Sequence, residues 1–182
     1  MLVSNVTAAK PATGGALSVA PLSTTLPTTA NGALDNAYKN MGYISEDGLT
    51  HDMSRSTQSI KAWGGDIVLD IQDEKTDDYN FTLIEALNVD VLKLVHGDTN
   101  VSGALATGIT INANATELPS QVFIFDMIMR DGALKRIVIP NGRIINVSEV
   151  TYSDSDAVGY ACQLRAYPDA SENTHYEYIL KA

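Results

Sequence analysis

The segment 121–129, Gln-Val-Phe-Ile-Phe-Asp-Met-Ile-Met, constrains the fold more than any other part of this sequence. It is short and almost continuously apolar, which is typical of a strand that is buried on both faces. Asp131 and Gly132 follow it as a hairpin turn signal, and 134–139 supplies the strand that pairs with it. The chain therefore needs a sheet whose centre is covered from both sides.

Further strand patterns cover much of the remaining sequence. They lie at 16–22, 41–45, 60–63, 66–72, 78–82, 101–113, 143–151, 158–167 and 176–180. A turn signal at Pro140-Asn141-Gly142 and another at 153–156 separate the last of them. We predict a mainly β fold, with two antiparallel sheets in a sandwich or flattened barrel and one flanking helix. We expect a single domain over 1–182, in which 1–15 is an extended arm and 16–182 forms the sandwich with its helix.

The helix is predicted at about 82–96. Thr82 and Glu85 have the spacing of a capping box, in which the two residues satisfy each other's backbone N–H groups. Apolar residues then recur at helical spacing, namely Leu83, Ile84, Leu87, Val91, Leu94 and Val95. A glycine directly after this stripe ends the helix. A break at Asn88 or Asp90 into two pieces is the alternative.

The segments 46–59 and 73–78 show no pattern of apolar residues that could face a core. The polar segment 46–59 has no apolar periodicity, so we expect a long projecting loop there. In 66–72 apolar and acidic residues alternate, which predicts a half-buried strand with an acidic outer face, and 73–78 should be a charged turn. The first 35 residues carry almost no charge. They could form an arm that lies against a partner or a flexible terminus, and the sequence leaves both interpretations open.

Composition narrows the classes of function. With 12 basic and 22 acidic residues the formal charge is -10, which argues against a protein that grips nucleic-acid phosphates or an anionic membrane surface. No apolar run approaches the roughly 20 residues needed to span a bilayer. The N-terminus lacks the pattern of a secretory signal, so we expect synthesis in a cytoplasm.

We find no catalytic, metal or cofactor site in the sequence. It contains no phosphate loop, dinucleotide-binding fingerprint or Gly-x-Ser-x-Gly elbow. The histidines His51, His96 and His175 lack metal-ligand spacing, so surface or capping roles are expected. The acidic residues at 66–78 lack the tight glycine turn of a calcium loop. Cys162, the only cysteine, is expected to be a small core residue. We therefore expect no cofactor and no enzymatic activity.

Four segments resemble the major tail proteins of siphophages, which form the tail tube. They are Phe-Thr-Leu-Ile-Glu-Ala-Leu-Asn-Val-Asp-Val-Leu-Lys-Leu-Val-His-Gly at 81–97, Met-Gly-Tyr-Ile-Ser-Glu-Asp-Gly-Leu-Thr at 41–50, Ile-Lys-Ala-Trp-Gly-Gly-Asp at 60–66 and Gly-Ala-Leu-Lys-Arg-Ile-Val-Ile-Pro-Asn-Gly-Arg at 132–143. The segments follow the order of the family and span most of the chain.

The resemblance implies a β-sandwich with a flanking helix that assembles into hexameric rings around a channel. The rings stack through N-terminal arms, C-terminal parts and the long loop, and DNA passes through during ejection without specific binding. The implied partners are further copies of the chain, a tape-measure protein and tail-terminator or baseplate proteins, with no membrane. The implied location is the virion, after synthesis in the bacterial host cytoplasm.

Three sets of candidate residues follow from this resemblance and the patterns above. The acidic channel face comprises Asp66, Asp70, Asp78 and Asn80; the inter-ring loop comprises Glu46, Asp47, His51, Asp52 and Arg55; the inter-subunit arm comprises Leu2, Val3 and Val6. An acidic wall would repel DNA phosphates and let the duplex slide. Alternation defines two faces of a strand without telling which one lines the channel.

Three alternatives to a non-contractile tail tube remain. The nearest is the inner tube of a contractile tail, which a neighbouring sheath gene would identify. The second is a virion decoration domain or adhesin, which favours a protomer that is stable alone. The third is a small hydrolase or isomerase, which needs a convergent polar site.

Overall fold

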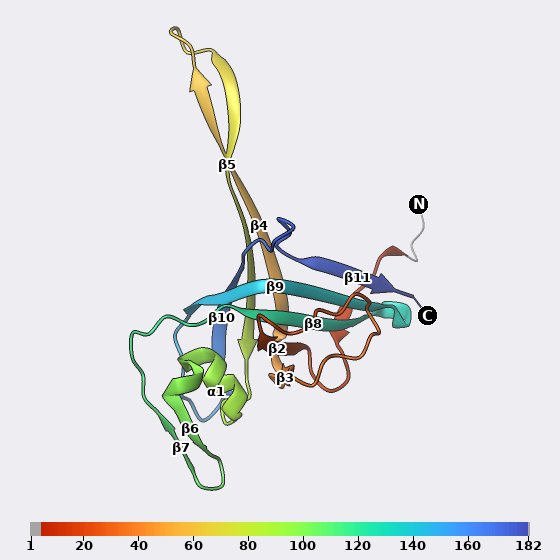
Figure 1. Ribbon diagram of the computed structural model, residues 1–182, viewed down its shortest axis with the longest axis vertical. Coiled ribbons are helices and arrows are strands. Elements are labelled where there is room, and N and C mark those ends of the chain that lie inside the picture. Colours follow the sequence, from red (N-terminus) through yellow and green to blue (C-terminus); the bar gives the residue numbers. More distant parts are fainter. Residues whose placement is uncertain (1–4, 182) are drawn as a thin grey trace.

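The computed structural model describes residues 5–181 and consists of two antiparallel β-sheets and one α-helix (Figure 1). The larger sheet contains β1 (Ala9–Pro11), β2 (Leu17–Pro21), β3 (Lys39–Asn40), β4 (Ile44–Lys61), β5 (Ile67–Leu83), β8 (Gln121–Met129), β9 (Leu134–Val147), β10 (Tyr160–Ala166) and β11 (Tyr176–Leu180). The smaller sheet pairs β6 (Val101–Ala104) with β7 (Gly108–Ile111), and the helix α1 is Val89–His96. Short 3-10 turns lie at Asp98–Asn100 and Arg130–Gly132.

The strand order of the larger sheet is β3-β2-β8-β9-β10-β5-β4, with β1 also on β8 and β11 also on β9. The two ends of this order, β3 and β4, do not pair with each other, so the sheet is not closed. The prediction of a mainly β fold with two antiparallel sheets and one helix is confirmed. The flattened barrel, which was one of the two predicted forms, does not occur.

The large sheet curls around its core. In the strand order β9 and β10 separate β8 from β5. Nevertheless, the ring centroid of Phe125 on β8 lies 5.4 Å from that of Phe81 and 6.0 Å from that of Tyr79, both on β5. The two halves of the sheet therefore face each other across one apolar core, in the manner of a sandwich. The helix α1 adds Val91, Leu92, Leu94 and Val95 to this core.

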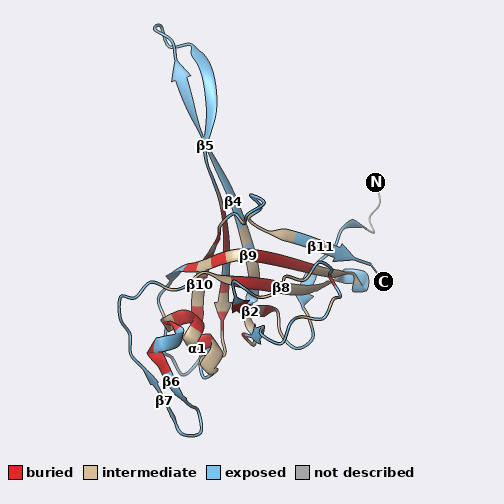
Figure 2. Ribbon diagram, in the orientation of Figure 1, coloured by how far each residue is buried: buried red, intermediate tan, exposed pale blue. Residues whose placement is uncertain are grey.

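Strand β8 is covered on both faces, as its sequence predicts. Phe123 and Phe125 belong to the main core, whereas Val122 and Ile124 pack in a second cluster on the opposite face. The second cluster is covered by Leu26, Leu34, Tyr38, Tyr176 and Tyr178. Figure 2 shows the resulting band of buried residues along β8 and β9.

The helix is shorter than predicted, because it begins after Asn88. The Asn88 side chain accepts a hydrogen bond from the backbone N–H of Asp90 at 3.0 Å and caps the helix. Thr82 lies instead in β5, where it pairs with β10. The Glu85 carboxylate accepts from the backbone N–H of Tyr43 at 3.0 Å. The predicted capping box at Thr82 and Glu85 is therefore wrong, and the break at Asn88 is the true start.

The predicted loop at 46–59 and the predicted turn at 73–78 are both wrong. The first lies within the 18-residue strand β4 and the second within the 17-residue strand β5, and these strands pair as one hairpin. The distal part of this hairpin projects from the body of the molecule (Figure 1), and residues 52–75 are all exposed. Segment 66–72 is largely strand, as predicted, but its residues are exposed and not half-buried. A ribbon without cover on either face needs no apolar alternation, and neither 46–59 nor 73–78 shows any.

The predicted turn at Pro140-Asn141-Gly142 is also wrong, because β9 runs through it. Gln121 of β8 lies opposite Gly142, while Phe123 lies opposite Ile139. The strand β9 thus carries an extra residue, which makes a β-bulge where the sequence suggests a turn. Within 5–181 no helix is long and apolar enough to cross a membrane.

Candidate functional site

The most exposed element of the molecule is the hairpin of β4 and β5. At about 3.3 Å per residue, the 18 residues of β4 extend roughly 60 Å. At its tip the backbone N–H of Ala62 donates to the carbonyl of Asp66 at 2.8 Å, and Gly64 and Gly65 adopt positive φ angles of 113° and 100°. These angles favour glycine, so the Gly-Gly pair closes the hairpin. Trp63, beside this pair, is fully exposed.

The hairpin carries apolar side chains that nothing covers within the described chain. They are Met53, Ile60, Trp63, Ile67, Val68, Leu69 and Ile71. Figure 2 shows this part of the molecule as continuously exposed. Contiguous exposed apolar residues of this kind mark surfaces that bind a partner. The hairpin is therefore the leading candidate for an interaction surface.

The base of the hairpin is fixed by Asp77 of β5, which is completely buried. Its Oδ2 accepts from Lys75 Nζ at 2.7 Å and from Thr174 Oγ1 at 2.5 Å, while its Oδ1 lies 3.3 Å from Nε2 of His51 on β4. Burial raises the pKa of Asp77, but the hydrogen bonds from Lys75 and Thr174 outweigh it and lower that pKa to about 2. Asp77 thus joins both hairpin strands to the segment that precedes β11.

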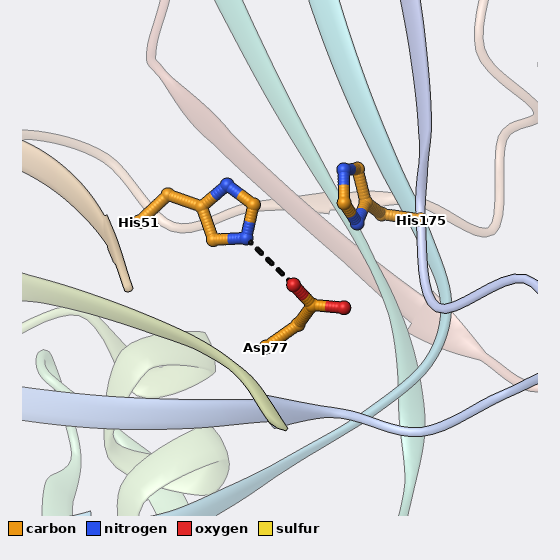
Figure 3. Close-up of side chains that lie close together, drawn as sticks. All are labelled: His51, Asp77 and His175. Carbon is orange, nitrogen blue, oxygen red and sulfur yellow. Dashed lines mark hydrogen bonds and ion pairs between the residues drawn. The ribbon is translucent and has the colours of Figure 1, made fainter. Parts of the chain in front are cut away.

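Aromatic packing completes this base. The His51 ring stacks on the Tyr79 ring with centroids 4.0 Å apart and an interplanar angle of 10°. The ring of His175 meets the His51 ring edge-on, with centroids 5.0 Å apart. Burial and the neighbouring His51 lower the pKa of His175. Two of the three histidines expected at separate surface or capping positions therefore lie together (Figure 3).

The structure does not bring the four candidate channel residues onto one face. Asp66 and Asp70 lie on the exposed part of the hairpin, whereas Asp78 is buried near its base. The register places Ser56 opposite Glu74 but Thr57 opposite Gln72, so β5 has an extra residue between them. Such a bulge inverts the alternation of side chains. Asp70 and Asp78 therefore point to opposite sides of the ribbon.

Asp78 is also neutralised by an adjacent strand. Arg165 of β10 donates two hydrogen bonds of 2.8 Å to its carboxylate, and Gln163 donates a third at 3.1 Å. The hydrogen bond from Arg165 lowers the pKa of Asp78. Asn80 follows on the same face of β5 and is exposed.

The five candidate residues of the inter-ring loop lie on β4 in three different surroundings. Glu46 and Asp47 lie in an irregular part of β4, where Ile44 and Leu49 pair with β5 but the residues between them do not. Asp52 and Arg55 are exposed on the projecting hairpin. The remaining one, His51, is a packed residue of the hairpin base.

Of the candidate arm residues, Leu2 and Val3 lie outside the residues that the structure describes. Val6 is 75% exposed. Ala9–Pro11 forms β1 and pairs with the end of β8, so this part of the arm belongs to the large sheet.

Sequence reasoning missed the apolar hairpin residues and Asp77. The signal for the hairpin is Gly64-Gly65 at the centre of two extended segments, since a glycine pair is typical of a tight hairpin turn. No comparable signal marks Asp77, because its partners at 51 and 174 are remote in sequence.

A curled antiparallel sheet with two open ends and an exposed apolar hairpin are features of a subunit that assembles with other chains. A family model described as phage tail tube protein matches residues 4–182, so the chain belongs to the phage tail tube protein family. Its role is structural and its place is the virion. No curated protein matches the chain.

Proposed function

We propose that the chain forms hexameric rings, that these rings stack into the tube of a long, non-contractile tail, and that DNA passes through the tube into the host. The observation that carries this proposal is the hairpin of β4 and β5, whose apolar residues lie exposed in the isolated subunit. A soluble monomer rarely keeps such a surface uncovered. A neighbouring subunit in the same or the next ring is the proposed cover.

The open sheet supports ring formation. Its terminal strands β3 and β4 present backbone groups that no other described strand pairs with. Unpaired strand edges are templates for joining another chain. Pairing β4 of one subunit with the opposite edge of the next would extend the sheet around a ring and remove both edges.

The acidic channel wall is proposed for two separate pairs of residues. Asp66 and Asp70 lie on the exposed hairpin, and Asp78 and Asn80 lie near its base, with Asp78 on the side of the ribbon opposite Asp70. Because Asp78 is paired with Arg165, the hairpin pair carries more free charge. Replacing Asp66 and Asp70 together by Lys should slow DNA ejection from assembled virions, and unchanged ejection would remove this pair from the wall.

The proposed partners are other copies of the chain, a tape-measure protein in the channel, and terminator or baseplate proteins at the tube ends. Synthesis in the host cytoplasm precedes assembly. Glu46, Asp47, Asp52 and Arg55 are proposed to contact the adjacent ring, because they lie on β4 where it leaves the body.

The test is tube formation by the full-length chain, followed by light scattering on a sizing column and by negative-stain microscopy. We expect rings or tubes with a central hole. Trp63→Ser should abolish or strongly reduce them, while its unfolding free energy changes by less than about 0.5 kcal/mol because Trp63 packs on nothing in the subunit.

The matched control is Tyr152→Ser, which removes an exposed aromatic residue outside the hairpin. Tubes that form equally well with Trp63→Ser and with Tyr152→Ser would contradict the role of the hairpin. A strictly monomeric wild-type chain at high concentration would instead favour a decoration or adhesin domain.

A further inference from the structure

The base of the hairpin brings together side chains of the kinds that bind transition metals. They are His51 from β4, Asp77 from β5 and His175 from the segment before β11 (Figure 3). One ring nitrogen from each histidine and one carboxylate oxygen of Asp77 all lie within 4.8 Å of one another. This grouping exists only in the folded chain and is independent of ring or tube formation.

The distance between His51 and Asp77 matches the spacing of two ligands of one metal ion. Nε2 of His51 lies 3.3 Å from Oδ1 of Asp77. Two ligands that each lie about 2.0–2.1 Å from a tetrahedral Zn²⁺ are about 3.4 Å apart. His51 and Asp77 are therefore already spaced as two such ligands, and the nitrogen of His175 has to approach by no more than about 1.4 Å.

The carboxylate of Asp77 is oriented by groups behind it. Lys75 Nζ and Thr174 Oγ1 both donate to Oδ2, at 2.7 and 2.5 Å. These contacts direct Oδ1 toward His51. Hydrogen bonds to the second oxygen of a metal-binding carboxylate are a regular part of metal sites. The ammonium group of Lys75 also repels a cation, so we expect moderate affinity.

The two histidine rings are held in place by packing. Tyr79 stacks on His51, and His175 meets the same ring edge-on. Thr174 Oγ1 lies 3.3 Å from Nδ1 of His175 and gives that ring a second contact. A set of ligands that is restrained before binding loses less entropy when the ion arrives.

We propose that His51, Asp77 and His175 bind one divalent transition-metal ion, with Zn²⁺ as the best match. Imidazole and carboxylate ligands suit Zn²⁺ and Co²⁺, and three protein ligands leave a fourth position for water or a ligand from another molecule. The ion would tie both hairpin strands to the C-terminal segment across the long chain loops between 51, 77 and 175.

The test uses the full-length, tag-free chain after removal of metal ions with a chelator. Co²⁺ is titrated in, and its visible absorption reports tetrahedral coordination; Zn²⁺ is then added in competition. We expect one Co²⁺ per chain, displacement by Zn²⁺, and a rise in Tm on adding Zn²⁺ because the ion binds only the folded state.

The variants His51→Gln and His175→Gln should each weaken binding by at least about tenfold. His96→Gln is the matched control, because His96 lies on α1 against Tyr160 and away from the site. Circular dichroism in the presence of chelator verifies that each variant is folded. The proposal is overturned if the wild type gives no tetrahedral Co²⁺ spectrum, or if His175→Gln binds as tightly as His96→Gln.

Discussion

Arg136 is the buried charge on which the packing of the N-terminal region depends. It is 6% exposed, and it donates to both oxygens of Asp126 at 2.6 and 3.0 Å. It also donates to the carbonyls of Thr29 and Gly32 at 3.1 and 2.8 Å. One guanidinium group thus fixes segment 22–38 over the sheet.

We expect Arg136→Met to lower the unfolding free energy by about 3–5 kcal/mol, because it leaves the Asp126 carboxylate and two carbonyls without their donor. Urea denaturation measures this change. The control is the neighbouring Lys135→Met, whose partly exposed pair with Glu177 should contribute less than about 1 kcal/mol. Equal losses in the two variants would contradict this account.

Cys162 is predicted to be unreactive in the native chain. It is 3% exposed, and burial raises the pKa of its thiol to about 12, so the reactive thiolate is scarce at neutral pH. A colorimetric thiol reagent should therefore react at the rate of unfolding and quickly in strong denaturant. Rapid reaction of the folded chain would show that the site opens far more often than its packing indicates.

The side-chain partners were the least predictable features from sequence. The core role of Cys162 and the buried run of β8 follow from local apolar patterns. The Asp77 network does not, because residues 51, 77 and 174 meet only after β4, β5 and the C-terminal segment have packed. The β-bulge near Gln72 could not be predicted from the sequence either, yet it places Asp70 and Asp78 on opposite sides of the ribbon.

At the scale of elements, the start of α1 gives a direct test of two interpretations. Asn88→Ala should cost about 1 kcal/mol, because it removes the N-cap acceptor of α1. Thr82→Val should be neutral or stabilising, because Thr82 lies in a strand and β-branched apolar residues suit strands. Thermal denaturation of both variants measures the difference. A larger loss for Thr82→Val would favour the capping box.

The helix and the hairpin were mispredicted for the same reason, although their local patterns differ. The stripe from Leu83 to Leu87 matches a helix, but pairing with β10 and β4 holds Leu83 in β5, and Leu87 is exposed. In 46–59 and 73–78 the local pattern is polar, and the strands form there through pairing within the hairpin. Tertiary pairing overrode local preference in both places.

At the scale of the whole molecule, stability should be uneven. The distal hairpin, 52–75, has no buried residues, whereas β8 lies in the centre of the core. Amide hydrogens of 52–75 should exchange much faster than those of β8 in the free subunit and should become protected in tubes. Hydrogen exchange with mass spectrometry measures both states. Equal protection of the hairpin before and after assembly would contradict its burial there.

The fold class was predictable because strand periodicity survives wherever one face meets a core. Whether the sheet closes into a barrel was not predictable, because no pattern in the sequence indicates whether β3 and β4 pair with each other. The hairpin was predicted only as a loop at 46–59, because a ribbon that covers no core in its own subunit needs no apolar alternation there.

In the proposed assembly the hairpin is anchored at one end and is covered only by a neighbouring subunit, which has a kinetic consequence. The first subunits to meet must immobilise roughly 33 Å of projecting ribbon, the length of residues 52–61 of β4, while few contacts are available to offset the lost entropy. Each later subunit adds to a surface that is already ordered. Spontaneous growth should therefore begin with a lag that pre-formed seeds abolish, which would confine polymerisation to places where a template is supplied.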